Sequence, residues 1–273
     1  MSKKILIIGG DSILGSGLSA YFKKNNIKHS KTTRRKNSKS IFLDLININK
    51  QKNKIEKIIN SFDIIIYCVS ITSINECQRN PINSYFINVK QTLFLFSLIK
   101  KNIKVIYMST ASIFDGHKKK CVEDDSHLPL NMYGIQKSDV EKKILNKENF
   151  TIIRISKVIS KDMEILLDWK EKIKNNEIIS AYTNRFLNPV SMQYFTRILR
   201  FIIFTNNNKK IIHISSNKKI SRYEFAYAWF KFNKYNLKLL KPALAGRNYK
   251  QSNLIKNTEF NLPIKNDYSN GFK

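Results

Sequence analysis

The most constraining feature of the sequence is the stretch from Ile5 to Gly15, where an apolar run ends in glycine and a helical pattern follows. The run Ile5–Ile8 contains no polar residue, which is typical of a strand buried on both faces. Gly9 and Gly10 come next, and glycine permits the tight turn that a strand-to-helix junction needs. The chain is therefore expected to begin with a strand–turn–helix unit.

The same alternation of strand and helix patterns continues through the first half of the chain. Strands are expected at Ile5–Gly9, Ile27–Thr32, Ile64–Val69, Val105–Ser109 and Thr151–Ile155. Helices are expected at Leu14–Asn25, Ile55–Asn60, Pro81–Lys101 and Tyr133–Leu145. This order predicts an α/β fold with a Rossmann-type, doubly wound parallel sheet.

The pattern loosens from about Met163 and predicts a smaller C-terminal lobe. Its expected elements are helices at Met163–Asn175, Ser191–Phe204 and Ser221–Phe232, and short strands at Ile178–Ile179 and Ile211–Ile214. No linker rich in Gly, Ser or Pro separates the two halves. We predict an NAD(P)-binding domain over residues 1–160 and a substrate-binding lobe over 161–273 that is not an independent domain.

The glycine turn predicts a binding site for the pyrophosphate of a dinucleotide. In a strand–turn–helix unit, glycines let the backbone approach the phosphates, and the free N–H groups of the helix N-terminus favour anions. Ser12 replaces the middle glycine of the usual spacing, and its hydroxyl can bind phosphate or cap the helix. A plain turn without a ligand stays open as the alternative. The residues assigned to this part of the cofactor site are Gly9, Asp11, Ser12, Ile13, Leu14 and Gly15.

The residues after the second expected strand predict which cofactor binds. An acidic residue there binds the ribose 2′-hydroxyl of NAD, whereas a cation accommodates the 2′-phosphate of NADP. The sequence has Arg34 and Arg35 at this place and no acidic neighbour. We expect NADPH to be preferred, with NAD as the alternative, and Asp44 to lie on the adenine side.

The net charge of +29 in 273 residues raises the question of a nucleic-acid partner. The lysines are spread along the chain without a dense basic arm, so we expect no specific nucleic acid. No apolar run reaches the length of a membrane-spanning helix, and the N-terminal segment lacks a signal-peptide pattern. Three cysteines without a CxxC pair favour a reducing, cytoplasmic compartment and no metal site.

A catalytic pair is predicted after the fourth expected strand. Tyr133 and Lys137 are four residues apart, so a helix places both side chains on one face. A nearby ammonium favours the phenolate and is expected to lower the pKa of the tyrosine. Such a tyrosine can donate a proton to a carbonyl oxygen as hydride arrives, and a hydroxyl at the strand end can hold the same oxygen.

The spacing Tyr-x-x-x-Lys occurs a second time, at Tyr227 and Lys231. This copy lies in the expected lobe helix, away from the carboxyl ends of the parallel strands where cofactors bind in such folds. We therefore interpret Tyr227 as a packing residue and Tyr133 as the functional one.

Three segments of the chain resemble the extended short-chain dehydrogenases/reductases, which include nucleotide-sugar epimerases, dehydratases and reductases. GGDSILG at 9–15 is similar to their glycine turn, MSTASIFDG at 108–116 to their Ser/Thr strand end, and PLNMYGIQK at 129–137 to their Tyr-x-x-x-Lys. Within this group the chain looks most like the dTDP-4-dehydrorhamnose reductase branch. The resemblance implies the site residues Thr110 as the catalytic hydroxyl, Tyr133 as the acid, Lys137 as its modulator and ribose contact, and Val69 and Ser70 as cofactor contacts.

The resemblance implies an NADPH-dependent reductase of a nucleotide-diphosphate-linked 4-keto-6-deoxy sugar, serving polysaccharide or glycoconjugate synthesis. The substrate is then a nucleotide sugar, no membrane partner is expected, and a homodimer is left open. An epimerase on the same scaffold and a non-catalytic regulatory or binding member remain alternatives. Dehydration is disfavoured because Ala111 and Ser112, after Thr110, offer no acid/base carboxylate. The chain departs from the branch at Tyr67–Ser70, at Thr110–Phe114 and at Lys157, so the identity of the sugar does not follow.

Overall fold

The structure of the protein is a computed structural model that describes residues 3–36, 38–117, 120–205, 208–246, 254–258 and 267–272. The chain divides into two compact units that are interleaved along the sequence. The first comprises Met1–Phe114, Ser126–Arg154 and Ile202–Ile212, and the second comprises Asp115–Asp125, Ile155–Phe201 and His213–Lys273. The functional division predicted at residue 160 stays a prediction.

The largest sheet among the described residues has seven strands. Its strands, in spatial order, are β11 (Ile211–Ile214), β6 (Phe150–Ile155), β5 (Lys104–Thr110), β4 (Ile64–Tyr67), β1 (Ile5–Ile8), β2 (His29–Thr33) and β3 (Ile41–Phe42). The pairs β1–β2, β1–β4, β2–β3 and β4–β5 are parallel. Strands β1, β4 and β6 are buried along their whole length, as the apolar runs of β1 and β4 predict. The expected Rossmann-type α/β fold is confirmed.

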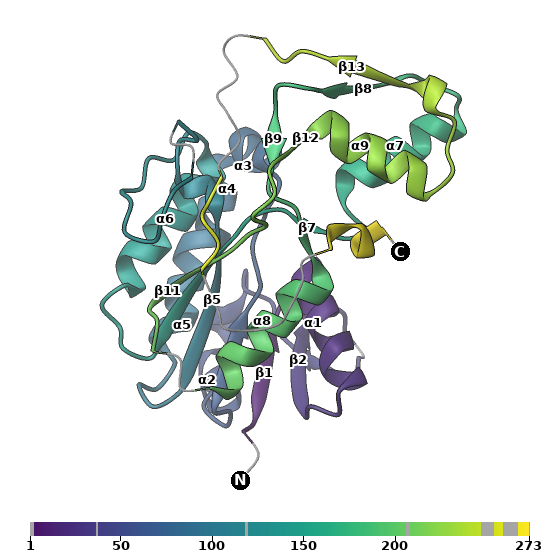
Figure 1. Cartoon of the computed structure of the whole chain (residues 1–273). Helices are drawn as coiled ribbons and strands as arrows, with labels where there is room; N and C mark the ends of the chain where they lie inside the picture. The colour runs from purple at the N-terminus through teal and green to yellow at the C-terminus, as the bar shows by residue number, and fades with distance from the viewer. Residues whose placement is uncertain are drawn as a thin grey trace. The chain divides into compact units, whose positions relative to one another are not determined.

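In the described part of the first unit, six α-helices connect these strands. They are α1 (Ile13–Lys24), α2 (Lys52–Ile59), α3 (Ile74–Arg79), α4 (Pro81–Tyr85), α5 (Thr92–Ser97) and α6 (Met132–Ile144). Short 3₁₀ turns occur at η1 (Ile48–Gln51) and η3 (Ala111–Ile113). In Figure 1, β1 and β2 lie side by side in purple with α1 next to them.

The prediction of one continuous helix over Pro81–Lys101 is wrong, because the helix is interrupted and ends earlier. After α4 the chain forms a π-helical turn, η2 (Phe86–Gln91), before α5 ends at Ser97. The hydroxyl of Thr92 donates a hydrogen bond to the carbonyl of Ile87, five residues back, at 3.1 Å. The π turn contains Asn88, whose side chain is buried, and such turns are frequent at functional sites.

The second unit is formed by short strands and helices. Its strands are β7 (Val158–Ile159), β8 (Ile179–Tyr182), β9 (Phe186–Leu187), β10 (Val190–Ser191), β12 (Ile220–Ser221) and β13 (Leu240–Ala243). Its helices are α7 (Glu164–Lys174), α9 (Arg222–Phe232), η4 (Leu237–Leu239) and η5 (Tyr268–Phe272), while α8 (Met192–Phe204) has residues in both units. Trp169, Phe225 and Trp229 pack together in its core.

The strand Ile211–Ile214 has the expected bounds but not the expected place. The expected place is the C-terminal lobe, whereas the structure places this strand as β11 at the edge of the main sheet, next to β6. Its short apolar run fits either position, since periodicity does not distinguish between sheets. In the described part of the chain, no helix is long and apolar enough to span a membrane.

Candidate functional site

The glycine positions of the turn after β1 leave no room for a side chain. Gly9 has φ of +89°, a conformation that favours glycine. A Cβ atom on Gly15 would lie 2.2 Å from the carbonyl oxygen of Gly9, and one on Gly9 would lie 2.7 Å from the side chain of Val69. The turn therefore keeps its backbone bare, as a cradle for phosphates requires, and it brings the predicted cofactor contact Val69 next to Gly9.

Ser12 caps helix α1. Its hydroxyl donates a hydrogen bond to the carbonyl of Gly9 at 2.7 Å and accepts one from the N–H of Gly15 at 3.1 Å. Of the two uses expected for this hydroxyl, the structure provides the helix cap. The first turn of α1 contains no acidic residue, so the positive end of the helix dipole stays available to an anion.

Asp11 lies beside the end of β2. Its carboxylate accepts a hydrogen bond from the hydroxyl of Thr33 at 2.5 Å, and that hydroxyl also accepts one from the N–H of Arg35 at 3.1 Å. Arg34 and Arg35 are exposed. The turn and the end of β2 therefore place one carboxylate and two guanidinium groups on neighbouring segments.

Asp44, which follows β3, is held by its own loop. Its carboxylate oxygens accept hydrogen bonds from the N–H of Ile46 at 3.1 Å and from the side chain of Asn47 at 2.8 Å. Side chains of this kind stabilise turns by bonding to residues just ahead of them. Asp44 therefore has a local structural use besides the adenine contact that the sequence predicts.

The residues predicted to be catalytic are carried by β5 and α6. Thr110 is the last residue of β5, and its hydroxyl accepts a hydrogen bond from the N–H of Ser112 at 3.1 Å. Helix α6 begins just before Tyr133, capped by Asn131, whose side-chain oxygen accepts from the N–H of Gly134 at 2.9 Å. A Cβ on Gly134 would lie 2.1 Å from the carbonyl oxygen of Ser112, so this glycine lets α6 approach the end of β5 closely.

The surroundings of Tyr133 raise its pKa. Burial raises the pKa of Tyr133 above its ordinary value, the Cys77 thiol raises it further, and a hydrogen bond with the Thr110 side chain lowers it. The residue as a whole is half-buried. The lower pKa expected from a neighbouring lysine is therefore not found, because removal of the phenol from water raises the pKa of Tyr133 more than its hydrogen bonding lowers it.

Lys137 is buried behind Tyr133. Its side chain is 3% exposed, and the ammonium donates a hydrogen bond to the carbonyl of Met108 at 2.9 Å. The nitrogen lies 4.8 Å from the ring centre of Tyr107 and 5.9 Å from that of Tyr133. Burial lowers the pKa of Lys137 to about 8, which leaves it a cation at neutral pH.

The second Tyr-x-x-x-Lys lies on α9 in the other unit. Tyr227 is 38% exposed, and the ammonium of Lys231 lies 5.0 Å from its ring centre. The ring of Tyr227 stacks on that of Tyr223, with ring centres 6.5 Å apart, so Tyr227 packs at the surface of α9, whereas the core face of this helix is formed by Phe225, Trp229 and Phe230.

Sequence reasoning missed a buried polar chain next to α6. Asn88, on the π-helical turn, donates to the side-chain oxygen of Gln136 at 2.7 Å, and Gln136 donates to the hydroxyl of Ser84 at 2.7 Å. Asn88 also accepts from the N–H of Ile71, one residue after the predicted contact Ser70. The position of Gln136 directly before Lys137 is the feature of the sequence that could have indicated this buried chain.

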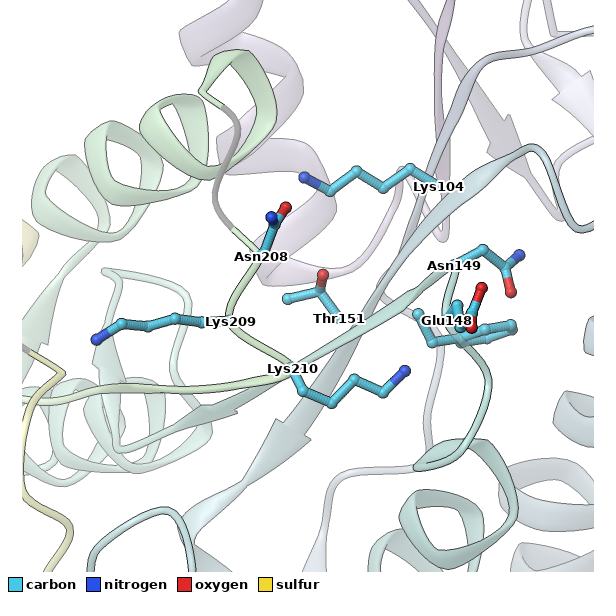
Figure 2. Close-up of a pocket in the computed structure, with 8 residues that line it drawn as sticks. Lys104, Glu148, Asn149, Thr151, Asn208, Lys209 and Lys210 are labelled. Carbon is cyan, nitrogen blue, oxygen red and sulfur yellow. The ribbon is translucent and has the colours of Figure 1, made fainter.

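A hollow of about 280 Å³ lies at the end of the sheet where strands β5 and β6 begin, opposite to the end that carries Thr110 (Figure 2). Lys104 and Thr151 belong to the beginnings of β5 and β6, whereas Thr110 ends β5. The residues that line the hollow are Lys104, Glu148, Asn149, Phe150, Thr151, Asn208, Lys209 and Lys210. None of the residues predicted for the cofactor or for catalysis is among them.

A glycine turn after β1, a hydroxyl at the end of β5 and a Tyr-x-x-x-Lys helix behind it form the arrangement of the extended short-chain dehydrogenases/reductases. The chain belongs to the RmlD substrate-binding domain family, whose model matches residues 3–253. This result confirms the resemblance inferred from the sequence.

The solved structures share the fold of this chain, while the proteins similar to it in structure or in sequence carry different functions in their names. The dTDP-4-dehydrorhamnose reductase of Bacillus anthracis in complex with NADP is 20% identical, with a TM-score of 0.79 over 94% of this chain and 92% of that one. The UDP-glucose 4-epimerase of Thermotoga maritima with UDP-glucose is 16% identical, with a TM-score of 0.75 over 93% and 90%. Methionine adenosyltransferase 2 subunit beta of Pongo abelii is 24% identical over 247 residues, 83% of this chain and 71% of that protein.

Proposed function

We propose that this protein is an NADPH-dependent reductase of a nucleotide-diphosphate-linked 4-keto-6-deoxy sugar. The observation that carries the proposal is the meeting of Thr110, Tyr133 and Lys137 at the carboxyl end of β5, within the sheet that also carries the glycine turn. The family match and the fold shared with a dTDP-4-dehydrorhamnose reductase in complex with NADP support the choice of reaction.

The residues present fit a dinucleotide. The bare turn from Gly9 to Gly15 and the N-terminus of α1 would hold the pyrophosphate, and Arg34 and Arg35 would bind the 2′-phosphate. Lys137 would hold the nicotinamide ribose. When bound, NADPH supplies the hydride that reduces the keto group.

The side chains of this site move the proton. The phenol of Tyr133 donates its proton to the carbonyl oxygen of the sugar as that oxygen becomes an alkoxide, and the hydroxyl of Thr110 donates a hydrogen bond to the same oxygen. Because its pKa is raised, Tyr133 enters the reaction with its proton in place. The nearby ammonium of Lys137 stabilises the phenolate that remains.

A second candidate is a non-catalytic member that acts as a subunit of another enzyme. It is favoured by the similarity to the methionine adenosyltransferase 2 subunit beta proteins, which are named as subunits. This candidate predicts dinucleotide binding without turnover. An epimerase on the same scaffold predicts an isomerised sugar without net change in the cofactor.

The test is a panel of nucleotide-activated keto sugars with NADPH or NADH, followed by the nicotinamide absorbance and by product analysis. The proposal expects NADPH oxidation with one 4-keto-6-deoxy sugar, strongly reduced in Tyr133→Phe. Binding of NADPH without oxidation across the panel would favour the subunit, and sugar isomerisation without oxidation would favour the epimerase.

A further inference from the structure

The end of β2 has no acidic residue of its own, but a carboxylate from the glycine turn lies against it. In dinucleotide-binding folds, the acidic residue that binds the ribose 2′-hydroxyl stands about 20 residues after the glycine turn, near the end of the second strand. Thr33, the last residue of β2, lies 22 residues after Asp11. Its hydroxyl donates a hydrogen bond to Oδ2 of Asp11 at 2.5 Å, which brings a carboxylate to the place where the sequence lacks one.

The direction of the bond between Thr33 and Asp11 is fixed by a third group. Thr33 is 5% exposed, and its hydroxyl oxygen accepts a hydrogen bond from the N–H of Arg35 at 3.1 Å. Because an N–H group can only donate, the hydroxyl proton is left for the carboxylate. Hydrogen bonds from a hydroxyl to an ionised acceptor are short and strong. The carboxylate of Asp11 is therefore held at the end of β2 by a buried donor.

Two further hydrogen bonds hold the glycine turn against β2. The N–H of Gly9 donates to the hydroxyl of Thr32 at 2.9 Å, and the N–H of Gly10 donates to the carbonyl of Thr32 at 3.0 Å. Gly10 directly precedes Asp11 in the turn, and Thr32 directly precedes Thr33 in the strand. The backbone therefore sets the position of Asp11 relative to the end of β2, and the side-chain bond adds to it.

One oxygen of the Asp11 carboxylate is open to a ligand. Among the described residues, Oδ1 of Asp11 has no hydrogen-bond partner, and the residue is exposed. Arg34 and Arg35 follow Thr33 directly and are exposed as well. A ligand bound at the end of β2 is therefore flanked by one carboxylate and two guanidinium groups.

These two kinds of charge favour different cofactors. The adenosine ribose of NADH has a 2′-hydroxyl, which can donate a hydrogen bond to a carboxylate. That of NADPH carries a 2′-phosphate, which a guanidinium attracts and a carboxylate repels. Discrimination between two ligands can come from repulsion of one as well as from attraction of the other. Asp11 and the two arginines therefore act in opposite directions on the choice of cofactor.

We propose that Asp11 is a specificity-determining residue of the cofactor site. Held by Thr33, its carboxylate would bind the ribose 2′-hydroxyl of NADH and repel the 2′-phosphate of NADPH, and so it limits the preference that the two arginines create. The inference rests on the dinucleotide site of the proposed function. It moves the role of Asp11 from the pyrophosphate to the adenosine ribose and makes NADH a second usable cofactor.

The test is calorimetric titration of the full chain with NADH and with NADPH, before and after Asp11→Asn. Asparagine keeps the size of the side chain and an oxygen that can accept from Thr33, but it removes the charge. We expect NADH to bind more weakly and NADPH more tightly. The ratio of the two affinities should shift toward NADPH by about tenfold, the effect of one hydrogen bond to a charged group. The control is Glu171→Gln, an exposed carboxylate on α7, which should leave both affinities unchanged.

The ratio of affinities distinguishes a specificity residue from one that only supports the turn, because a loosened turn weakens both cofactors alike. An unchanged or reversed ratio in Asp11→Asn would overturn the proposal, whether both affinities fall together or neither moves. An unsubstituted protein that binds neither cofactor would instead contradict the dinucleotide site itself, and with it both this inference and the proposed function. Since no sugar is present in the titration, a lack of turnover does not affect the result.

Discussion

A tyrosine that donates a proton must hold it at neutral pH, and the surroundings of Tyr133 favour that form. Replacing Tyr133 by Phe removes the hydroxyl and keeps the ring, so folding and NADPH binding should persist. We expect the turnover rate to fall by about 10²–10⁴, the usual contribution of general-acid catalysis. The control is Tyr227→Phe on the exposed face of α9, which should leave the rate unchanged. A fully active Tyr133→Phe enzyme would show that another group donates the proton.

The pKa of Lys137 predicts the pH dependence of the reaction. An exposed lysine loses its proton near pH 10.5, whereas burial lowers the pKa of Lys137 to about 8. Below this value the ammonium is present, and as the pH rises through it the charge that stabilises the phenolate is lost. The turnover rate at saturating substrate should therefore fall above about pH 8. A rate that stays constant to pH 10 would contradict this assignment.

The choice between NADPH and NADH depends on the residues at the end of β2. A hydrogen bond to a charged group contributes about 1.5–3 kcal/mol, so Arg34→Ser/Arg35→Ser should weaken NADPH binding by roughly tenfold or more. NADH binding should change little, because the neighbouring carboxylate of Asp11 remains beside Thr33. Direct binding titrations measure both affinities, with Lys24→Ser on α1 as the control for loss of a surface charge. Equal losses for the two cofactors would mean that the arginines do not read the 2′-phosphate.

Among the elements, the strand–turn–helix unit makes the sharpest steric prediction. A Cβ on Gly15 would lie 2.2 Å from the carbonyl oxygen of Gly9, so Gly15→Ala must displace the turn or the start of α1. We expect NADPH binding to be lost while far-ultraviolet circular dichroism shows the sheet and helices retained. The matched control is Gly246→Ala, where the added Cβ meets nothing within 4 Å. Retained affinity in Gly15→Ala would separate this turn from cofactor binding.

The order of elements could be predicted because strand and helix periodicities differ and glycine marks the turns. The irregular elements could not be predicted from the sequence. The π-helical turn at Phe86–Gln91 depends on tertiary hydrogen bonds of Asn88, and β3 is only two residues long. The burial of Glu141 and Arg154 was equally out of reach, because their pairing joins a helix and a strand that are separate in sequence and a charged residue alone predicts exposure. The Tyr133–Lys137 pair was accessible because its spacing is local.

For the molecule as a whole, the net charge of +29 has to be separated from function. A chain with this charge attracts any polyanion, so weak binding to DNA and RNA is expected, with an affinity that falls steeply as salt rises. Specific recognition needs base contacts beyond phosphate contacts, and a dispersed set of lysines does not provide them. Binding to duplexes of different sequence, measured at about 50 mM and 200 mM salt, should show a large salt effect and no sequence effect. Tight binding to one defined sequence at the higher salt would mean that the basic surface is selected for nucleic acid, and the charge could then no longer be treated as independent of function.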